Sequence, residues 1–150
     1  MALSLLDAAL RYAEHGWPVH PCGANKVPLV KDWPNAASTD EKQIREWWSK
    51  YPNAMIGVVT GPRSGLFVID VDVKGGAPGL KSLAALEKEC GKLPDTLSQT
   101  TPSGGIHFLF EYPKDVKLGN SIGKLGKGID TRGEGGYIIV APSTGYRWRQ

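Results

Sequence analysis

The chain has 150 residues, of which 41% are hydrophobic and 22% charged, a composition typical of ordinary soluble globular proteins. This length suffices for one domain, or for two small subdomains that share a core. No apolar run approaches the roughly 20 residues of a membrane span and the N-terminus lacks a signal-peptide pattern, so we expect a cytoplasmic protein without a membrane partner. Cys22 and Cys90 are isolated, which argues against a disulfide framework or a zinc knuckle.

The net charge of +3 is concentrated in the C-terminal part of the chain. Residues 113–150 carry seven basic and three acidic side chains. Such an excess suits a polyanionic partner such as nucleic acid or a nucleoside triphosphate. Solvated surface lysines would give the same count, so charge alone does not decide between the two interpretations.

The first fifty residues are expected to form two helices separated by irregular chain. Hydrophobic spacing, prolines and glycines predict a helix, a short strand, a loop and a second helix, over residues 3–15, 17–21, 22–35 and 40–50. Ser38 and Glu41 have the spacing of a capping box, which places the start of the second helix.

The rest of the chain is predicted to be mainly strands. Strands are expected over residues 54–59, 66–73, 96–101, 106–112, 129–132, 137–140 and 146–149. Pro78 and Gly91 bracket a helix over 78–90, and the lysine- and glycine-rich segment 113–128 is expected to be a mobile loop. The pattern predicts an α/β or α+β fold with a mixed sheet. Because the last strand stops abruptly at Gln150, we expect a piece of a larger protein.

Asp70 and Asp72 are the first candidate site residues. They lie in the apolar run 66–73, where side chains alternate between the two faces of the predicted strand. Both carboxylates then share one face, and the odd-numbered apolar residues take the other. Two carboxylates on a buried strand repel each other, and a divalent cation compensates them best. An exposed acidic face is the alternative, but the absence of other charges in this run favours a metal site.

A second candidate segment joins a glycine turn to a histidine. Ser103, Gly104 and Gly105 offer a hydroxyl and backbone amides that can approach a phosphate closely. His107 follows on a strand whose core face is predicted to carry Ile106, Phe108, Phe110 and Tyr112, so that His107 points to the opposite side. A plain hairpin with a structural histidine is the alternative interpretation.

A third segment adds an acid and an arginine. Asp130 and Arg132 share one strand face, so Asp130 would complete a three-carboxylate site and Arg132 would bind phosphate oxygens with its planar fork. A local salt bridge between the two is the alternative. In loops before the Asp70 strand, Lys26, Lys31 and Arg63 have the reach for a triphosphate or a template strand, although each also suits an ordinary surface position.

The ordered set of motifs resembles the archaeo-eukaryotic primase superfamily, and most closely the bifunctional DNA primase/polymerase N-terminal (prim-pol) domain of plasmids, phages and other mobile elements. The resemblance rests on Asp70-Val71-Asp72, Ser103-Gly104-Gly105-Ile106-His107 and Gly128-Ile129-Asp130-Thr131-Arg132-Gly133, with further matches over 16–19, 57–61 and 136–142. The histidine motif is one glycine longer than the minimal Ser-x-His form.

This resemblance implies a DNA primase/polymerase that uses nucleoside triphosphates in DNA replication. It implies a sheet resembling an RNA-recognition motif packed on a smaller α/β unit, with the site between them. It assigns Asp70, Asp72 and Asp130 to Mg²⁺ or Mn²⁺, and Ser103, His107 and Arg132 to the incoming phosphates. DNA template and primer, and a C-terminal helical and helicase region, are the partners it implies.

Two other classes of function stay open from the residues themselves. One is a non-catalytic nucleotide- or DNA-binding module whose carboxylates hold a structural ion. The other is a different Asp-x-Asp metal enzyme, such as a glycosyltransferase or a nuclease. The histidine and arginine segments argue against a glycosyltransferase, because sugar-nucleotide enzymes do not need that combination.

Overall fold

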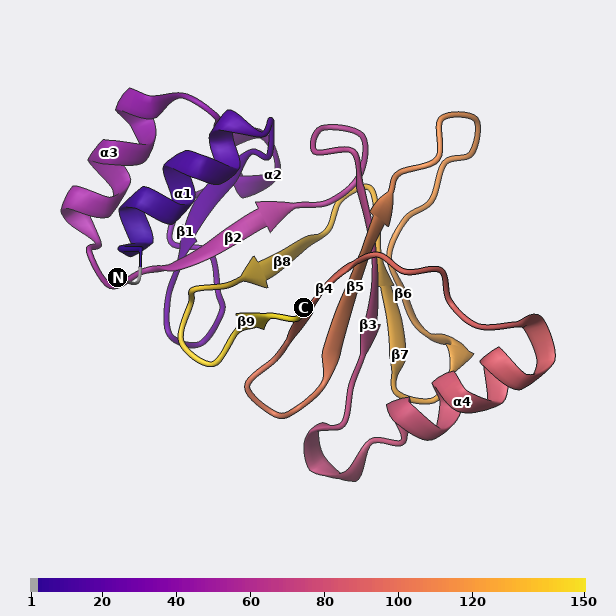
Figure 1. The fold of residues 1–150 in the computed structure, drawn as a ribbon. Helices are drawn as coiled ribbons and strands as arrows, with labels where there is room; N and C mark the ends of the chain where they lie inside the picture. The colour runs from indigo at the N-terminus through magenta and orange to yellow at the C-terminus, as the bar shows by residue number, and fades with distance from the viewer. Residues whose placement is uncertain (1–2) are drawn as a thin grey trace.

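The computed structural model describes residues 3–150 and has an α+β fold built on two sheets. The smaller sheet has the order β1-β2-β8, with strands Val19–Cys22, Met55–Val59 and Tyr137–Val140. The larger sheet has the order β6-β7-β3-β5-β4-β9, with strands Ser121–Gly126, Ile129–Arg132, Leu66–Val71, Ile106–Glu111, Leu97–Thr100 and Arg147–Trp148. Figure 1 shows the smaller sheet beside α1 and α3, and the larger sheet beside α4.

The helices are α1 (Leu5–Glu14), α2 (Trp33–Ala36), α3 (Glu41–Lys50), the short 3-10 helix η1 (Lys74–Gly76) and α4 (Gly79–Cys90). Two of the helices, α1 and α3, begin where a side-chain cap accepts from a backbone amide of the first turn. Ser4 Oγ accepts from the Asp7 amide at 3.0 Å, and Asp40 accepts from the Gln43 amide at 3.2 Å. The predicted capping box at Ser38 is therefore wrong. Ser38 Oγ instead accepts from the backbone amide of Asp40, which is itself the N-cap residue of α3.

One hydrophobic core connects the two sheets. Ile44 and Trp48 of α3 pack with Ile56 and Val58 of β2, all of them buried, and the cluster extends to the larger sheet. Its members there are Leu66, Val68 and Leu109. These three residues therefore lie on the face of the larger sheet that meets the smaller sheet.

The buried face of β5 is opposite to the predicted one. His107 and Leu109 are 7% and 3% exposed, whereas Phe108 and Phe110 are only half-buried. The sequence pattern favoured the aromatic side because it has more large apolar residues. The tertiary reason is that the aromatic side faces outward from the core between the sheets, so His107 points toward the smaller sheet.

Other differences from the predicted elements have local causes. The predicted loop 113–128 contains β6, an edge strand whose residues 122–125 are exposed on both faces and so lack hydrophobic alternation. α2 begins within the predicted loop 22–35 and ends one residue after it, and β1 begins two residues later than expected. Every strand pair among residues 3–150 is antiparallel, so the α+β class is confirmed but the expected mixed sheet is wrong. Within the same residues, no helix has both the length and the apolarity required to cross a membrane.

Candidate functional site

Four polar side chains form a row across the middle of the larger sheet. Asp70 of β3 is paired directly with Asp130 of β7 on one side and with His107 of β5 on the other. His107 is in turn paired with Gln99 of β4. Directly opposite residues on adjacent strands project to the same face. We call Asp130, Asp70, His107 and Gln99 the polar row.

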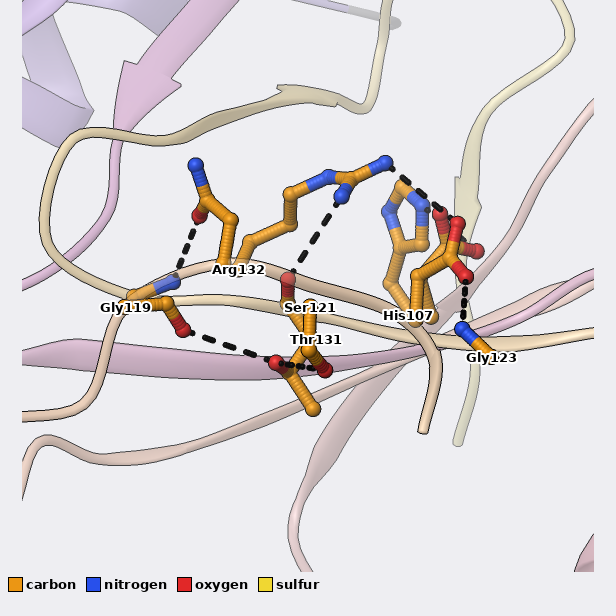
Figure 2. Close-up of polar contacts among 10 residues, drawn as sticks. His107, Gly119, Ser121, Gly123, Thr131 and Arg132 are labelled. Atoms are coloured by element: carbon orange, nitrogen blue, oxygen red, sulfur yellow. Dashed lines mark hydrogen bonds and ion pairs between the residues drawn. The ribbon is translucent and has the colours of Figure 1, made fainter. Parts of the chain in front are cut away.

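The charged groups of the polar row contact one another closely. His107 Nε2 lies 3.4 Å from Asp70 Oδ1, and Arg132 Nη2 lies 3.6 Å from Asp130 Oδ2. The Gly123 amide of β6 donates to Asp130 Oδ1 at 3.1 Å. Figure 2 shows Arg132 extending toward the part of the site where His107 lies, with Gly123 at its far edge. Both carboxylates are 22% exposed, so they are partly desolvated yet reachable from solvent.

Asp70 and His107 of the polar row line a cavity of about 440 Å³ between the two sheets, whereas Asp130 and Gln99 lie outside its lining. Asp70, His107 and Arg132 line it from the larger sheet, and Ile138 and Ile139 of β8 line it from the smaller one. Its volume and mixed lining suit a small organic ligand that carries charge. The cavity lies between the two sheets, where the family resemblance implies the site.

Aromatic side chains form the opposite wall of this cavity. Trp33 of α2 and Tyr137 of β8 have ring centroids 4.8 Å apart, and the Tyr146 ring lies 6.2 Å from that of His107. Burial, together with the negative charge of Asp70, raises the pKa of Tyr146 to about 12. The Tyr146 phenol is therefore protonated at neutral pH and is available as a hydrogen-bond donor.

Two of the cations expected to bind nucleotide are separated by the fold. Lys26, in the loop after β1, lines the cavity, and its Nζ lies 5.8 Å from the centre of the Tyr146 ring. Arg63 lies elsewhere: its guanidinium donates to the carbonyls of Pro34 and Ala37, at 2.7 Å for Ala37. Arg63 therefore ties the chain around α2 to the β2–β3 turn and lines a different cavity.

The turn formed by Ser103, Gly104 and Gly105 lies at the end of the β4–β5 hairpin, outside the cavity lining. Ser103 and Gly104 are exposed. Gly105 is required by close packing, because a Cβ there would lie 2.5 Å from the Val71 carbonyl oxygen. The glycine thus lets the hairpin approach the end of β3, and contact between this turn and a phosphate stays a prediction.

Asp72 differs from its expected position because β3 ends at Val71 rather than at residue 73. Its Oδ1 accepts from the Lys74 amide at 2.8 Å, and its backbone amide donates to the Gly128 carbonyl at 2.7 Å. Asp72 does not line the cavity that Asp70 lines. The carboxylate opposite Asp70 is that of Asp130, which lies sixty residues further along the chain.

The Asp70–Asp130 pair has the donor chemistry for a divalent cation. Across residues 3–150, no three or more His, Cys, Asp or Glu side chains are arranged to hold a metal ion. Mg²⁺ commonly binds through only one or two carboxylates, with water and substrate phosphates as its other ligands. Two facing, partly desolvated carboxylates fit such an ion.

Gln99 is the main residue of the polar row that we did not predict. Its side chain is fully buried, and its Nε2 lies 3.0 Å from His107 Nδ1. A signal was present in the sequence, because Gln99 and His107 each lie four residues from Ser103, the centre of the predicted hairpin turn. Tyr146 was also missed, since nothing in the local pattern links it to the site.

His20 lies buried behind the aromatic wall. Its ring is 5.1 Å from that of Tyr137 and 5.4 Å from that of Trp33, and its Nδ1 is 3.4 Å from Cys22 Sγ. A Cβ at Gly57, the residue opposite His20 on β2, would lie 2.4 Å from the imidazole. Burial lowers the pKa of His20 to about 4. The imidazole is therefore neutral in the folded protein over most of the acidic range.

This burial predicts acid-dependent stability. Between pH 6.5 and 4 the unfolded chain protonates His20 but the folded protein does not, so stability falls as the pH falls through this window. From pH 7 to 5, we expect His20 to contribute a loss of about 2 kcal/mol to the free energy of unfolding. Urea denaturation of the wild type and of His20→Gln at both pH values measures it. An equal pH dependence in the two proteins would contradict the prediction.

The model of the family "Bifunctional DNA primase/polymerase, N-terminal" (Prim-Pol) matches residues 9–150. The chain belongs to the Prim-Pol family. The match runs from within α1 to the end of the chain, so it includes both sheets and every member of the polar row. The chain is thus a primase/polymerase-type domain. No curated protein matches the chain.

Proposed function

We propose that this Prim-Pol domain is a metal-dependent DNA primase/polymerase catalytic domain that transfers nucleotidyl groups from (deoxy)ribonucleoside triphosphates on a DNA template. One observation carries the proposal: Asp70 and Asp130 are directly paired on adjacent strands, with His107 in contact with Asp70 and Arg132 in contact with Asp130. Carboxylates for a cation next to donors for phosphate oxygens are the two requirements of nucleotidyl transfer.

Asp70 and Asp130 are the proposed ligands of Mg²⁺ or Mn²⁺, and Asp72 is retained as a third ligand on the family resemblance. When bound, such ions lower the pKa of the attacking 3′-hydroxyl and stabilise the leaving pyrophosphate. The protein itself keeps the two carboxylates partly desolvated, which strengthens their attraction for a cation. It also holds them on adjacent strands of one sheet, so that little reorganisation is needed when the cation binds.

The remaining side chains of the cavity have roles in binding the nucleotide. Arg132 offers a planar fork of donors to phosphate oxygens, and Lys26 adds a second positive charge from the facing loop. His107 offers a directed N–H group. The aromatic wall of Trp33 and Tyr137 gives the base or sugar an apolar surface that excludes water.

The experiment is extension of a labelled primer on a DNA template by this chain. We expect extension with Mn²⁺ or Mg²⁺ and nucleoside triphosphates, loss of extension with a chelator, and recovery when metal is added back. Labelled DNA without nucleotide is the control, and its degradation would indicate a nuclease instead. Absence of extension with every metal and nucleotide would contradict a catalytic role.

A second candidate is a non-catalytic module that binds nucleotide or DNA. The position of Asp72 favours it, because β3 ends at Val71 and the Asp72 carboxylate already accepts from the Lys74 amide. Calorimetry separates the two functions. Tight binding of a nucleoside triphosphate with metal, combined with no extension in the assay above, is the result expected for a binding module.

A further inference from the structure

We propose that Gln99 is a positioning residue that fixes the orientation and tautomer of His107, with Nδ1 as a hydrogen-bond acceptor and the ring proton on Nε2. His107 then faces the cavity as a hydrogen-bond donor and not as a metal ligand. The inference about the proton depends only on hydrogen bonds within the chain. Its consequence for nucleotide binding rests on the function proposed above.

The orientation of the Gln99 amide is set by two backbone groups. The Ala141 N–H, which can only donate, lies 2.9 Å from Gln99 Oε1. The Ile139 carbonyl, which can only accept, lies 2.7 Å from Gln99 Nε2. Exchanging the amide oxygen and nitrogen would place donor against donor and acceptor against acceptor, so only one orientation satisfies both groups.

This orientation decides which nitrogen of His107 carries the proton. The second N–H of the Gln99 amide points to His107 Nδ1 at 3.0 Å, and an amide nitrogen cannot accept a hydrogen bond. Nδ1 is therefore an acceptor without a proton. In a neutral imidazole the proton then lies on Nε2, which is 3.4 Å from Asp70 Oδ1.

Burial makes the other arrangements costly. Gln99 is 0% exposed and His107 is 7% exposed, so water poorly replaces a partner lost from the bond between these two side chains. Turning the imidazole ring over would direct carbon atoms at both Gln99 and Asp70. An unpaired polar group in such surroundings is unfavourable. The hydrogen bonds from the backbone to Gln99 and from Gln99 to His107 therefore specify one ring orientation and one tautomer of His107.

The consequence concerns the chemistry of the proposed active site. A histidine binds a metal through a nitrogen that carries no proton, and the Nε2 of His107 is protonated. Its Nδ1 is occupied by Gln99. His107 can therefore offer its Nε2–H to an oxygen atom, either of the Asp70 carboxylate or of a bound phosphate, whereas a cation is left to Asp70 and Asp130.

Nitrogen-15 NMR of the histidine side chains tests the proposal without any activity measurement. In the wild-type chain, we expect His107 at neutral pH to show a protonated Nε2, an unprotonated Nδ1, and a coupling across the hydrogen bond from the Gln99 amide to Nδ1. We expect addition of Mg²⁺ alone to leave Nε2 protonated. A protonated Nδ1 in the wild type, or loss of the Nε2 proton with Mg²⁺, would overturn the proposal.

The variant Gln99→Glu sharpens the test. Its carboxylate can still accept from the Ala141 amide but cannot donate to Nδ1, so we expect His107 Nδ1 to become protonated. Ser143→Ala is the control, because it removes a different buried hydrogen bond, from the Ile56 amide at 2.9 Å, and should leave His107 unchanged. An unchanged His107 in folded Gln99→Glu would contradict the proposal. If Gln99→Glu does not fold, the wild-type spectra decide.

This test is independent of the proposed function. If the chain fails to extend primers but His107 has the expected protonation, the function is wrong and the role of Gln99 stands. If extension occurs but Nδ1 carries the proton, the role of Gln99 is wrong and the function stands.

Discussion

Replacing Asp70 or Asp130 with asparagine is expected to lower the rate of metal-dependent primer extension at least about a thousandfold. Each substitution removes a charged ligand of the proposed cation and keeps the shape of the side chain. Metal stabilisation of transition-state charge is worth several kcal/mol, and about 4 kcal/mol corresponds to about three orders of magnitude. Single-turnover extension at saturating nucleotide measures the loss.

Stability provides the internal check for these variants. The two carboxylates lie directly opposite each other, and like charges so placed destabilise a sheet. We therefore expect the melting temperature to stay unchanged or to rise while activity is lost. Asp115→Asn, at an exposed position outside the cavity lining, is the control and should retain full activity. Extension within tenfold of wild type in either site variant would contradict the assignment.

Replacing Arg132 with alanine is expected to reduce kcat/KM for the nucleotide by about 10- to 100-fold, since a hydrogen bond to a charged group is worth about 1.5–3 kcal/mol. The loss should appear mainly in KM if Arg132 binds the phosphates in the ground state. Arg132→Lys should recover only part of it, because lysine keeps the charge but lacks the planar fork. Steady-state kinetics with varied nucleotide provide the measurement.

Arg63→Ala is the matched control for Arg132. Both side chains are arginines, but Arg63 bonds backbone carbonyls near α2 and lines another cavity. We expect kcat/KM in Arg63→Ala to stay within about threefold of wild type, which is below 1 kcal/mol, with any effect seen in stability. Equal losses in the two variants would show that the cavity beside the polar row is not the nucleotide site.

Local sequence patterns predicted a large part of the fold and several residues of the candidate site. Hydrophobic spacing identified α1 and most strands, capping and boundary residues identified α3 and α4, and the glycine turn predicted the β4–β5 hairpin that brings Gln99 opposite His107. The pairing of Asp70 with Asp130 is different, because strands that are far apart in the chain leave no periodic signal of being neighbours. The residues allowed a shared three-carboxylate site as a hypothesis, and the ordered resemblance to a family favoured it over a local salt bridge between Asp130 and Arg132.

The remaining differences from expectation come from tertiary packing. The direction of His107 was predicted from the number of aromatic residues on each side of β5, whereas the core lies between the sheets on the other side. Arg63 looked like a free loop cation, but the carbonyl groups near α2 bind it. Asp72 was predicted to lie on a strand over 66–73, but β3 ends at Val71. Backbone hydrogen bonds of Asp72 with Gly79 and Gly128 redirect the chain there.

The most direct test is a crystal structure with Mn²⁺ and a non-hydrolysable nucleoside triphosphate, in which the anomalous signal locates the ion. We predict Mn²⁺ bound by carboxylate oxygens of both Asp70 and Asp130, with the triphosphate in the cavity near Arg132 and Lys26 and with His107 outside the metal coordination sphere. Mn²⁺ bound away from Asp70 and Asp130, or a triphosphate outside this cavity, would contradict the account.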